Sequence, residues 1–129
     1  MSIDAFQYTP RKRAAFAELA WIMPGARAGI VCFEADPGKV AGLPVLGVDP
    51  VADYRPLMAA AGLHVEAYKE TPGWQERVHA AFSAITANTG TLIAEMGERA
   101  AAAAVAEAML TIEIRPYQRR ITSVASCPG

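Results

Sequence analysis

Residues 22–37, "IMPGARAGIVCFEADP", decide the fold class of this chain. The Pro24-Gly25 pair ends the helical pattern that precedes it, because proline and glycine both interrupt a regular helix. The apolar run 28–33 that follows has the length of a strand and does not alternate strictly between apolar and polar side chains. We therefore expect a strand covered on both faces, which is typical of a parallel strand inside an α/β sheet.

The sequence on either side of this run predicts alternating helices and strands. Residues 35–52 are expected to form a connection with a short extended piece at 45–48, and residues 111–117 fit either a strand or a helix end. Thr9 and Asp53 are expected to cap the helices that follow them. The other elements are expected as helices over 10–23, 53–62, 74–87 and 92–110 and as strands over 63–70 and 119–128. This order predicts a mostly parallel sheet with helices packed on it.

The composition is typical of a single folded domain. The chain has 129 residues, of which 53% are hydrophobic and 19% are charged, so a packed core is expected. The formal net charge of -1 argues against a nucleic-acid surface, which needs a dense basic stripe. The short basic cluster 11–13 is therefore interpreted as a solvated helix end.

The cysteines and the apolar stretches predict a cytoplasmic protein without a metal, membrane or nucleic-acid partner. Cys32 and Cys127 lack metal-type spacing and indicate neither a zinc site nor a disulfide framework. Cys32 lies inside the apolar run and is expected in the core. The N-terminal residues contain no apolar signal region, and the Ala-rich stretch 100–110 is too short for a membrane span and contains Glu107.

The stretch "IDAFQYTPRKRAAFAELAWIMPGARAGIVCFE", residues 3–34, resembles the middle of a class I S-adenosylmethionine-dependent methyltransferase. In that family a helix carries a signature that begins with an acidic residue and ends in Pro-Gly-Gly, directly before the fifth strand. Glu18, Pro24 and Gly25 fill this signature here, while Trp21 and Ala26 depart from it. The resemblance makes 28–33 the counterpart of a central strand.

The resemblance continues to the end of the sequence. "DYRPLMAAAGLHVEAYKETPGW", residues 53–74, is similar to the family's helix ending in Ala-Ala-Gly and to the sixth strand after it. "RRITSVASCP", residues 119–128, resembles the seventh strand, which runs antiparallel in that fold. The implied architecture is an α/β partial Rossmann-like sheet with flanking helices and a helical insert at about 74–110, in one partial domain over 1–129.

The first half of the family's pattern has no counterpart in this sequence. That half carries the glycine-rich turn through which the backbone approaches the cofactor, and none of the ten glycines follows a strand in such a turn. The resemblance therefore implies the C-terminal half of a methyltransferase, beginning at or just after the fourth strand. The apolar strand 28–33 is then expected to present an unprotected edge.

The resemblance also implies site residues at the N-terminal end. Residues after the family's fourth strand lie beside the methionine part of the cofactor and beside the methyl acceptor. Asp4 and Gln7 are thus candidates for cofactor binding, and Phe6 and Tyr8 are candidates for substrate binding. The alternative is a frayed N-terminus with an incidental acidic residue.

The helical insert and the end of the apolar strand supply further candidates. Trp74 and Phe82 are expected to line the acceptor pocket, and His79 is the candidate proton acceptor because imidazole titrates near neutral pH. Glu34 follows the apolar strand at the edge where α/β proteins bind ligands. The alternatives are that Trp74 and Phe82 belong to the core and that His79 is a surface residue.

Two function classes remain open from the sequence. The first is a methyltransferase-like protein that uses S-adenosylmethionine on a small molecule and is incomplete alone: part of a split enzyme with a separate N-terminal half, or a truncated product without catalysis. The second is a non-catalytic α/β interaction module that forms a homodimer through its exposed sheet edge. Either way, we expect low stability as a monomer.

Overall fold

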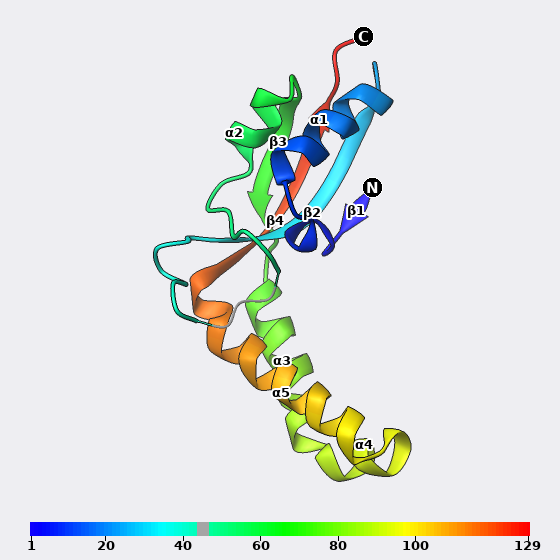
Figure 1. Ribbon diagram of the computed structural model, residues 1–129, viewed down its shortest axis with the longest axis vertical. Coiled ribbons are helices and arrows are strands. Elements are labelled where there is room, and N and C mark those ends of the chain that lie inside the picture. The colour runs from blue at the N-terminus through cyan, green and yellow to red at the C-terminus, as the bar shows by residue number, and fades with distance from the viewer. Residues whose placement is uncertain (44–46) are drawn as a thin grey trace.

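The computed structural model describes residues 1–43 and 47–129, and Figure 1 shows a sheet flanked by helices with a helical arm projecting from one end. In chain order the elements are β1 Ser2–Ile3, η1 Phe6–Tyr8, α1 Lys12–Ile22, β2 Arg27–Ala35, α2 Arg55–Ala60, β3 His64–Glu70, α3 Trp74–Ala87, α4 Thr89–Met96, α5 Glu98–Ile114, η2 Arg115–Tyr117 and β4 Gln118–Ser126. The α/β class expected from the sequence is confirmed.

The four strands form one sheet in the order β1-β2-β4-β3. β1 pairs in parallel with β2, where Ser2 lies opposite Ile30, and β4 runs antiparallel to both β2 and β3. The antiparallel last strand is as expected. The prediction of mostly parallel pairing is wrong, because β4 inserts between β2 and β3 and its pairing with each of them is antiparallel.

The main core lies between one face of the sheet and the helices α1 and α2. Alternate residues of β2, including Ile30 and Cys32, point into it and meet Phe16 of α1 and Met58 of α2. Burial of Cys32 is confirmed. Residues of β2 on the opposite face, such as Val31, are only half-buried. The expectation of two covered faces is therefore wrong, since α1 and α2 both pack on the same side.

The expected insert 74–110 holds α3, α4 and most of α5, and these helices form the arm in Figure 1. α3 and α4 both pack on α5. The single helix expected over 92–110 is two helices, because Gly97 adopts a backbone φ of 84° that a continuing helix does not allow. The undecided segment 111–117 is the end of α5 followed by the turn η2.

Local details of the helix starts differ from the sequence predictions. Thr9 does not cap α1, because Arg11 occupies the cap position with a left-handed φ of 52° and no side-chain cap bond. Asp53 does not occupy the cap position of α2 either, because Tyr54 is the cap residue, but Asp53 Oδ1 accepts the backbone N–H of Arg55, the first residue of the helix, at 2.9 Å. Residues 45 and 46 of the expected extended piece lie outside the described residues, and residues 47 and 48 form no strand.

The outer edge of the sheet is only briefly covered. β1 pairs with Ile30 and Val31, and no other described residue adds a strand on that side of β2. Ile3 of β1, the edge strand, is solvent-exposed. Within residues 1–43 and 47–129, no helix combines the length and the apolar character that crossing a bilayer requires.

Candidate functional site

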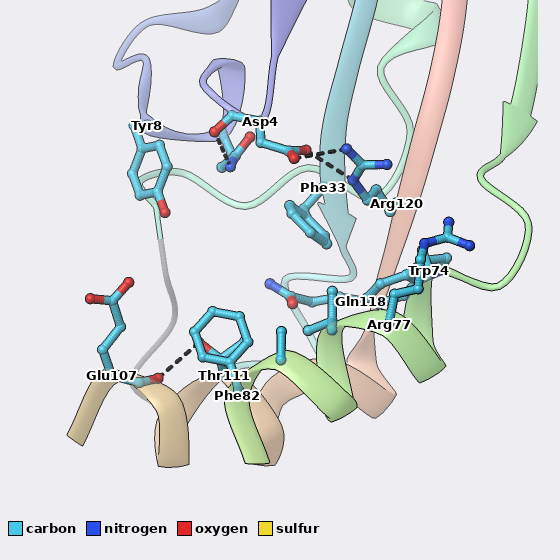
Figure 2. Close-up of a pocket in the computed structure, with 13 residues that line it drawn as sticks. Asp4, Tyr8, Phe33, Trp74, Arg77, Phe82, Glu107, Thr111, Gln118 and Arg120 are labelled. Atoms are coloured by element: carbon cyan, nitrogen blue, oxygen red, sulfur yellow. Dashed lines mark hydrogen bonds and ion pairs between the residues drawn. The ribbon is translucent and has the colours of Figure 1, made fainter. Parts of the chain in front are cut away.

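A cavity of about 410 Å³ lies where the sheet meets the helical arm, and we call it the edge cavity (Figure 2). The carboxyl ends of β1 and β2 reach this edge, and so does the start of β4, because β4 runs in the opposite direction. Helices α3 and α5 form the far wall. The lining residues are Asp4, Gln7, Tyr8, Phe33, Trp74, Arg77, Val78, Ala81, Phe82, Glu107, Thr111, Gln118 and Arg120.

An ion pair between Asp4 and Arg120 forms one rim of the edge cavity (Figure 2). Arg120 Nε donates to Asp4 Oδ1 at 3.0 Å, and an Arg120 terminal nitrogen donates to Asp4 Oδ2 at 2.8 Å. This forked geometry is among the stronger ion pairs that proteins form. Asp4 holds it from a left-handed backbone conformation, φ 49°, which Asp and Asn tolerate better than most residues. Both carboxylate oxygens of Asp4 are therefore engaged.

Gln7 is the second polar residue that the sequence placed at this site. It is 8% exposed, and its Nε2 donates to the carbonyl oxygen of Asp4 at 2.7 Å. Its Oε1 is buried and has no hydrogen-bond partner among the described residues. A buried acceptor without a partner costs about 1–3 kcal/mol. Gln7 therefore lines the edge cavity with a side chain whose acceptor atom is enclosed and unused.

Lys12 fixes the backbone beneath Gln7, contrary to the prediction that the cluster 11–13 is solvated. The Lys12 side chain is buried, and Nζ donates to the carbonyl oxygens of Thr9 at 3.1 Å, of Gln7 at 3.3 Å and of Val48. Burial lowers the pKa of Lys12. The ammonium turns inward because these carbonyl groups converge on it.

The loop at residues 47 and 48 closes over the same backbone. Val48 N–H donates to the Gln7 carbonyl oxygen at 3.1 Å. Gly47 has a φ of 102°, and a Cβ atom there would lie 2.7 Å from that same oxygen. Only glycine allows this approach, so the loop holds the main chain of Gln7 in place.

Aromatic side chains form the apolar part of the edge cavity. Phe33 and Trp74 meet edge to face with ring centroids 5.5 Å apart and an interplanar angle of 72°. Trp74 is anchored by its indole N–H, which donates to Glu70 Oε1 at 2.8 Å. Tyr8 and Phe82 line the cavity as well. These rings fit the apolar body of a small molecule.

The formal charges of the residues that line the edge cavity sum to zero. Asp4 and Glu107 are acidic, and Arg77 and Arg120 are basic. Arg77 also donates to the carbonyl oxygen of Pro72 at 2.7 Å, at the start of α3. A cavity with balanced charge favours a ligand without net charge.

The structure thus brings together five of the candidate residues and separates three. Asp4, Gln7, Tyr8, Trp74 and Phe82 line the edge cavity. Phe6 does not, because its ring packs on Phe16 at 4.4 Å between centroids and belongs to the core. His79 lies exposed on α3 and does not line the cavity.

Glu34 lies behind the edge cavity rather than in it. It is 2% exposed and lines a separate cavity of about 270 Å³ with Arg119. Its Oε1 accepts the hydroxyl of Tyr68 and the backbone N–H of Tyr54, and Arg119 lies 3.5 Å from its Oε2. Burial raises the pKa of Glu34, and the Tyr68 hydrogen bond opposes the shift.

Three strand residues that line the edge cavity were not predicted: Phe33 of β2, and Gln118 and Arg120 of β4. Phe33 and Arg120 are register partners on β2 and β4, which places both at the mouth. The signal for Phe33 was its position at the end of the apolar run. The signal for Arg120 was a basic pair at the start of an antiparallel strand, which puts it at the ligand-binding edge.

In the described residues, no group of three His, Cys, Asp or Glu side chains could hold a metal ion.

No protein-family model matches this sequence, and no curated protein matches it. Its fold does match solved structures. The cyclopropane synthase MmaA2 from Mycobacterium tuberculosis matches with a TM-score of 0.76 and 14% identity, covering 96% of this chain and 53% of that one. A putative sarcosine dimethylglycine methyltransferase from Galdieria sulphuraria matches with a TM-score of 0.73 and 17% identity, covering 97% and 51%.

A third match carries ligands. Phosphoethanolamine N-methyltransferase 2 from Haemonchus contortus, in complex with phosphomonomethylethanolamine and S-adenosylhomocysteine, has a TM-score of 0.70 and 14% identity, covering 98% of this chain and 32% of that one. At these identities the likeness shows a methyltransferase-like fold. The chain spans about half, or less, of the length of the structures it matches.

Proposed function

We propose that this chain is the acceptor-binding portion of an S-adenosylmethionine-dependent methyltransferase that acts on a small molecule. The observation that carries the proposal is the position of the edge cavity. It lies at the carboxyl ends of parallel strands, where α/β sheets bind ligands, and its aromatic wall is supplied by the helical arm. Its volume suits one small molecule.

The residues present fit only one end of the cofactor. Gln7 carries a buried acceptor atom without a partner, which suits the ammonium group of the methionine part. Asp4 would contribute through its position beside Gln7, because Arg120 engages both of its carboxylate oxygens. When bound, the cofactor supplies an electrophilic methyl group on sulfur. The adenosine end requires a glycine-rich turn from outside this sequence, so we propose a separate or preceding N-terminal portion as the partner.

In this proposal the chain supplies positioning and the exclusion of water. Phe33, Trp74 and Phe82 hold the acceptor's apolar body, and the rings exclude water from the reacting atoms. We assign no role to His79 in this proposal, since it is exposed on α3 and does not line the edge cavity. We place the protein in the cytoplasm, since Cys32 and Cys127 are both free thiols.

The test is calorimetric titration with S-adenosylmethionine in two settings. The chain alone is expected to give no saturable heat. The chain mixed with the protein encoded directly upstream in its genome, chosen for a glycine-rich turn after a strand, is expected to bind the cofactor with one site per pair. Two folded proteins that together bind no cofactor would refute the proposal.

We propose self-association as the second candidate function, favoured by the outer sheet edge. β1 covers only two residues of β2, and Ile3 of β1 is exposed. An apolar edge of this kind is a template for strand pairing. Sedimentation velocity on the wild type and on Ile3→Lys tests it: a dimer that Ile3→Lys dissociates supports this function, and a monomer over the whole concentration range excludes it.

A further inference from the structure

We propose that Gln118 recognises the ligand of the edge cavity: its side-chain amide pairs with a carboxamide or lactam group on a neutral small molecule that has an aromatic body. The inference rests on the proposed function only in taking the edge cavity as the acceptor site. It adds a chemical class of acceptor and the residue that recognises this class.

Gln118 reaches the edge cavity from the first position of β4. Side chains two residues apart on a strand lie on the same face of the sheet, so Gln118 shares a face with Arg120, and both line the edge cavity. Arg119 between them points to the other face, where it lies 3.5 Å from the buried Glu34 carboxylate. Figure 2 shows the Gln118 amide directed away from the backbone of β4 and into the edge cavity.

The Gln118 side chain is buried, but its amide is free. The residue is 8% exposed, and neither amide atom forms a hydrogen bond with a described residue. Neither atom is among the fully enclosed, unpaired atoms of the described residues, which include Gln7 Oε1. Both amide atoms of Gln118 therefore reach open space. Because a buried amide is costly without hydrogen-bond partners, these partners have to come from the contents of the cavity.

The other buried polar side chains of the cavity wall already use their donors within the protein. The indole N–H of Trp74 donates to Glu70 at 2.8 Å, and the hydroxyl of Thr111 donates to the carbonyl oxygen of Glu107 at 2.8 Å. The ion pair at the rim is likewise complete. In the part of the chain that the structure describes, Gln118 is thus the buried lining residue with both a free donor and a free acceptor.

The chemistry of the amide defines the group that it recognises. An amide places an acceptor oxygen beside an NH₂ donor in one plane. A carboxamide or a lactam carries the same two functions side by side, so two hydrogen bonds form with Gln118 at once. Exchanging the oxygen and nitrogen of Gln118 still leaves one donor beside one acceptor, so the match does not depend on which way the amide is turned.

The rest of the edge cavity defines the body of the ligand. Phe33 and Trp74 meet edge to face and present an aromatic wall, on which a ring of the ligand can pack. The formal charges of the lining sum to zero, and Asp4 and Arg120 already neutralise each other. A charged ligand would therefore lack a counter-charge, whereas a neutral aromatic amide fits both the wall and the polar group.

Gln118 also borders two other spaces, and each leads to a different expectation. One is a small pocket of about 20 Å³, which is large enough for one water molecule. The other is the cavity of about 270 Å³ that Glu34 and Tyr117 line. A resident water as the partner of the amide would make Gln118 indifferent to the amide of a ligand. A ligand in the cavity of Glu34 would contact Tyr117 instead of Trp74.

The test is NMR titration of the whole chain at pH 7 with benzamide, acetophenone and benzoate. Acetophenone has a methyl group where benzamide has its NH₂ donor, and benzoate carries a negative charge at the same place. The preference for benzamide over acetophenone, taken as the ratio of their dissociation constants, should fall about tenfold in Gln118→Met, which corresponds to the loss of one buried hydrogen bond. It should be unchanged in the matched control Gln75→Met, on the exposed surface of α3. Benzoate should bind the wild type more weakly than benzamide.

A second measurement needs no variant. In the wild type, bound benzamide should give nuclear Overhauser contacts to the side-chain NH₂ of Gln118 and to the ring of Trp74.

Four results would overturn the inference. They are the absence of saturable benzamide binding, the same preference in the wild type and in Gln118→Met, contacts of benzamide to Tyr117 instead of Trp74, and tighter binding of benzoate than of benzamide. Because no cofactor enters this experiment, its outcome is independent of whether the chain takes part in methyl transfer, which the calorimetric titration tests separately.

Discussion

The ion pair between Asp4 and Arg120 should contribute measurably to stability, and a double-mutant cycle can isolate its contribution. The variants are Asp4→Asn, Arg120→Met and their combination. Asn is the suitable replacement because it tolerates the left-handed φ of 49° at this position, so backbone strain does not enter the comparison. Arg120→Met keeps the apolar part of the side chain.

The expected coupling energy follows from geometry and exposure. The pair is bidentate, and the side chains are 19% exposed for Arg120 and 38% for Asp4. Exposed ion pairs contribute about 0.2–1 kcal/mol, whereas breaking a buried pair costs about 3–5 kcal/mol. Since this pair is partly exposed and forked, we expect a coupling energy of about 1–2 kcal/mol.

Urea unfolding of the four proteins measures this coupling. Each single variant should lower the free energy of unfolding, and the double variant should lose less than the sum of the two. High salt should reduce the coupling only in part, because the pair is partly shielded from solvent. A coupling energy below about 0.3 kcal/mol would refute the reasoning, since it would mean that the two groups do not interact in solution.

Three further substitutions test other parts of the structure by urea unfolding. Gly47→Ala should destabilise the protein by about 2 kcal/mol or more, because its Cβ would meet the Gln7 carbonyl oxygen at 2.7 Å in a left-handed backbone. Phe16→Ala should cost about 3–5 kcal/mol, because Phe16 is fully buried at the centre of the core. Glu34→Gln should be more stable than the wild type at pH values above the raised pKa of Glu34. This difference in unfolding free energy should disappear as the pH falls towards 4.5, the ordinary pKa of the carboxyl group.

The sign of the Glu34 prediction follows from proton binding. Burial raises its pKa in the folded state, so the folded protein binds this proton more tightly than the unfolded chain does. Wild-type stability therefore falls as the pH rises through the raised pKa, and Gln avoids that loss. A stability difference between wild type and variant that is the same at every pH would contradict the assignment.

Gly47→Ala and Phe16→Ala each have a matched control on a residue without the contact that is tested. Gly42 also has a left-handed φ, 81°, but nothing lies within 4 Å of the Cβ position. Gly42→Ala should thus cost only the backbone strain, and an equal loss at Gly42 and Gly47 would mean that the contact with Gln7 is absent. Ala17 lies exposed on the same helix as Phe16, and Ala17→Ser should change the unfolding free energy by less than about 0.5 kcal/mol.

Elements with strong local patterns could be predicted from the sequence. The apolar run 28–33 became β2, and the alternating segment at 63–70 became β3 with nearly the same bounds. Hydrophobic periodicity is local, so it survives without tertiary context. The insertion of β4 between two earlier strands depends on contacts far apart in the sequence. It makes two of the strand pairs antiparallel, where parallel pairs were expected.

The candidate site was predictable only in part, for the same reason. Asp4 and Gln7 were identified through a resemblance that covers contiguous sequence. Arg120 was missed because its partner is more than a hundred positions away, and no local pattern links the two. Lys12 was misplaced because its burial depends on carbonyl groups from a distant loop as well as from its own segment.

The place of β4 in the sheet has a consequence for how the protein is made on the ribosome. β2 and β3 do not touch as a pair, and residues 118–126 join them. During synthesis the backbone groups of β2 and β3 that pair with β4 stay without their partner strand until the whole helical arm has been translated. Assembly of the sheet is therefore a late step that pairs residues far apart in the sequence, and unpaired strand edges stay exposed until it is complete.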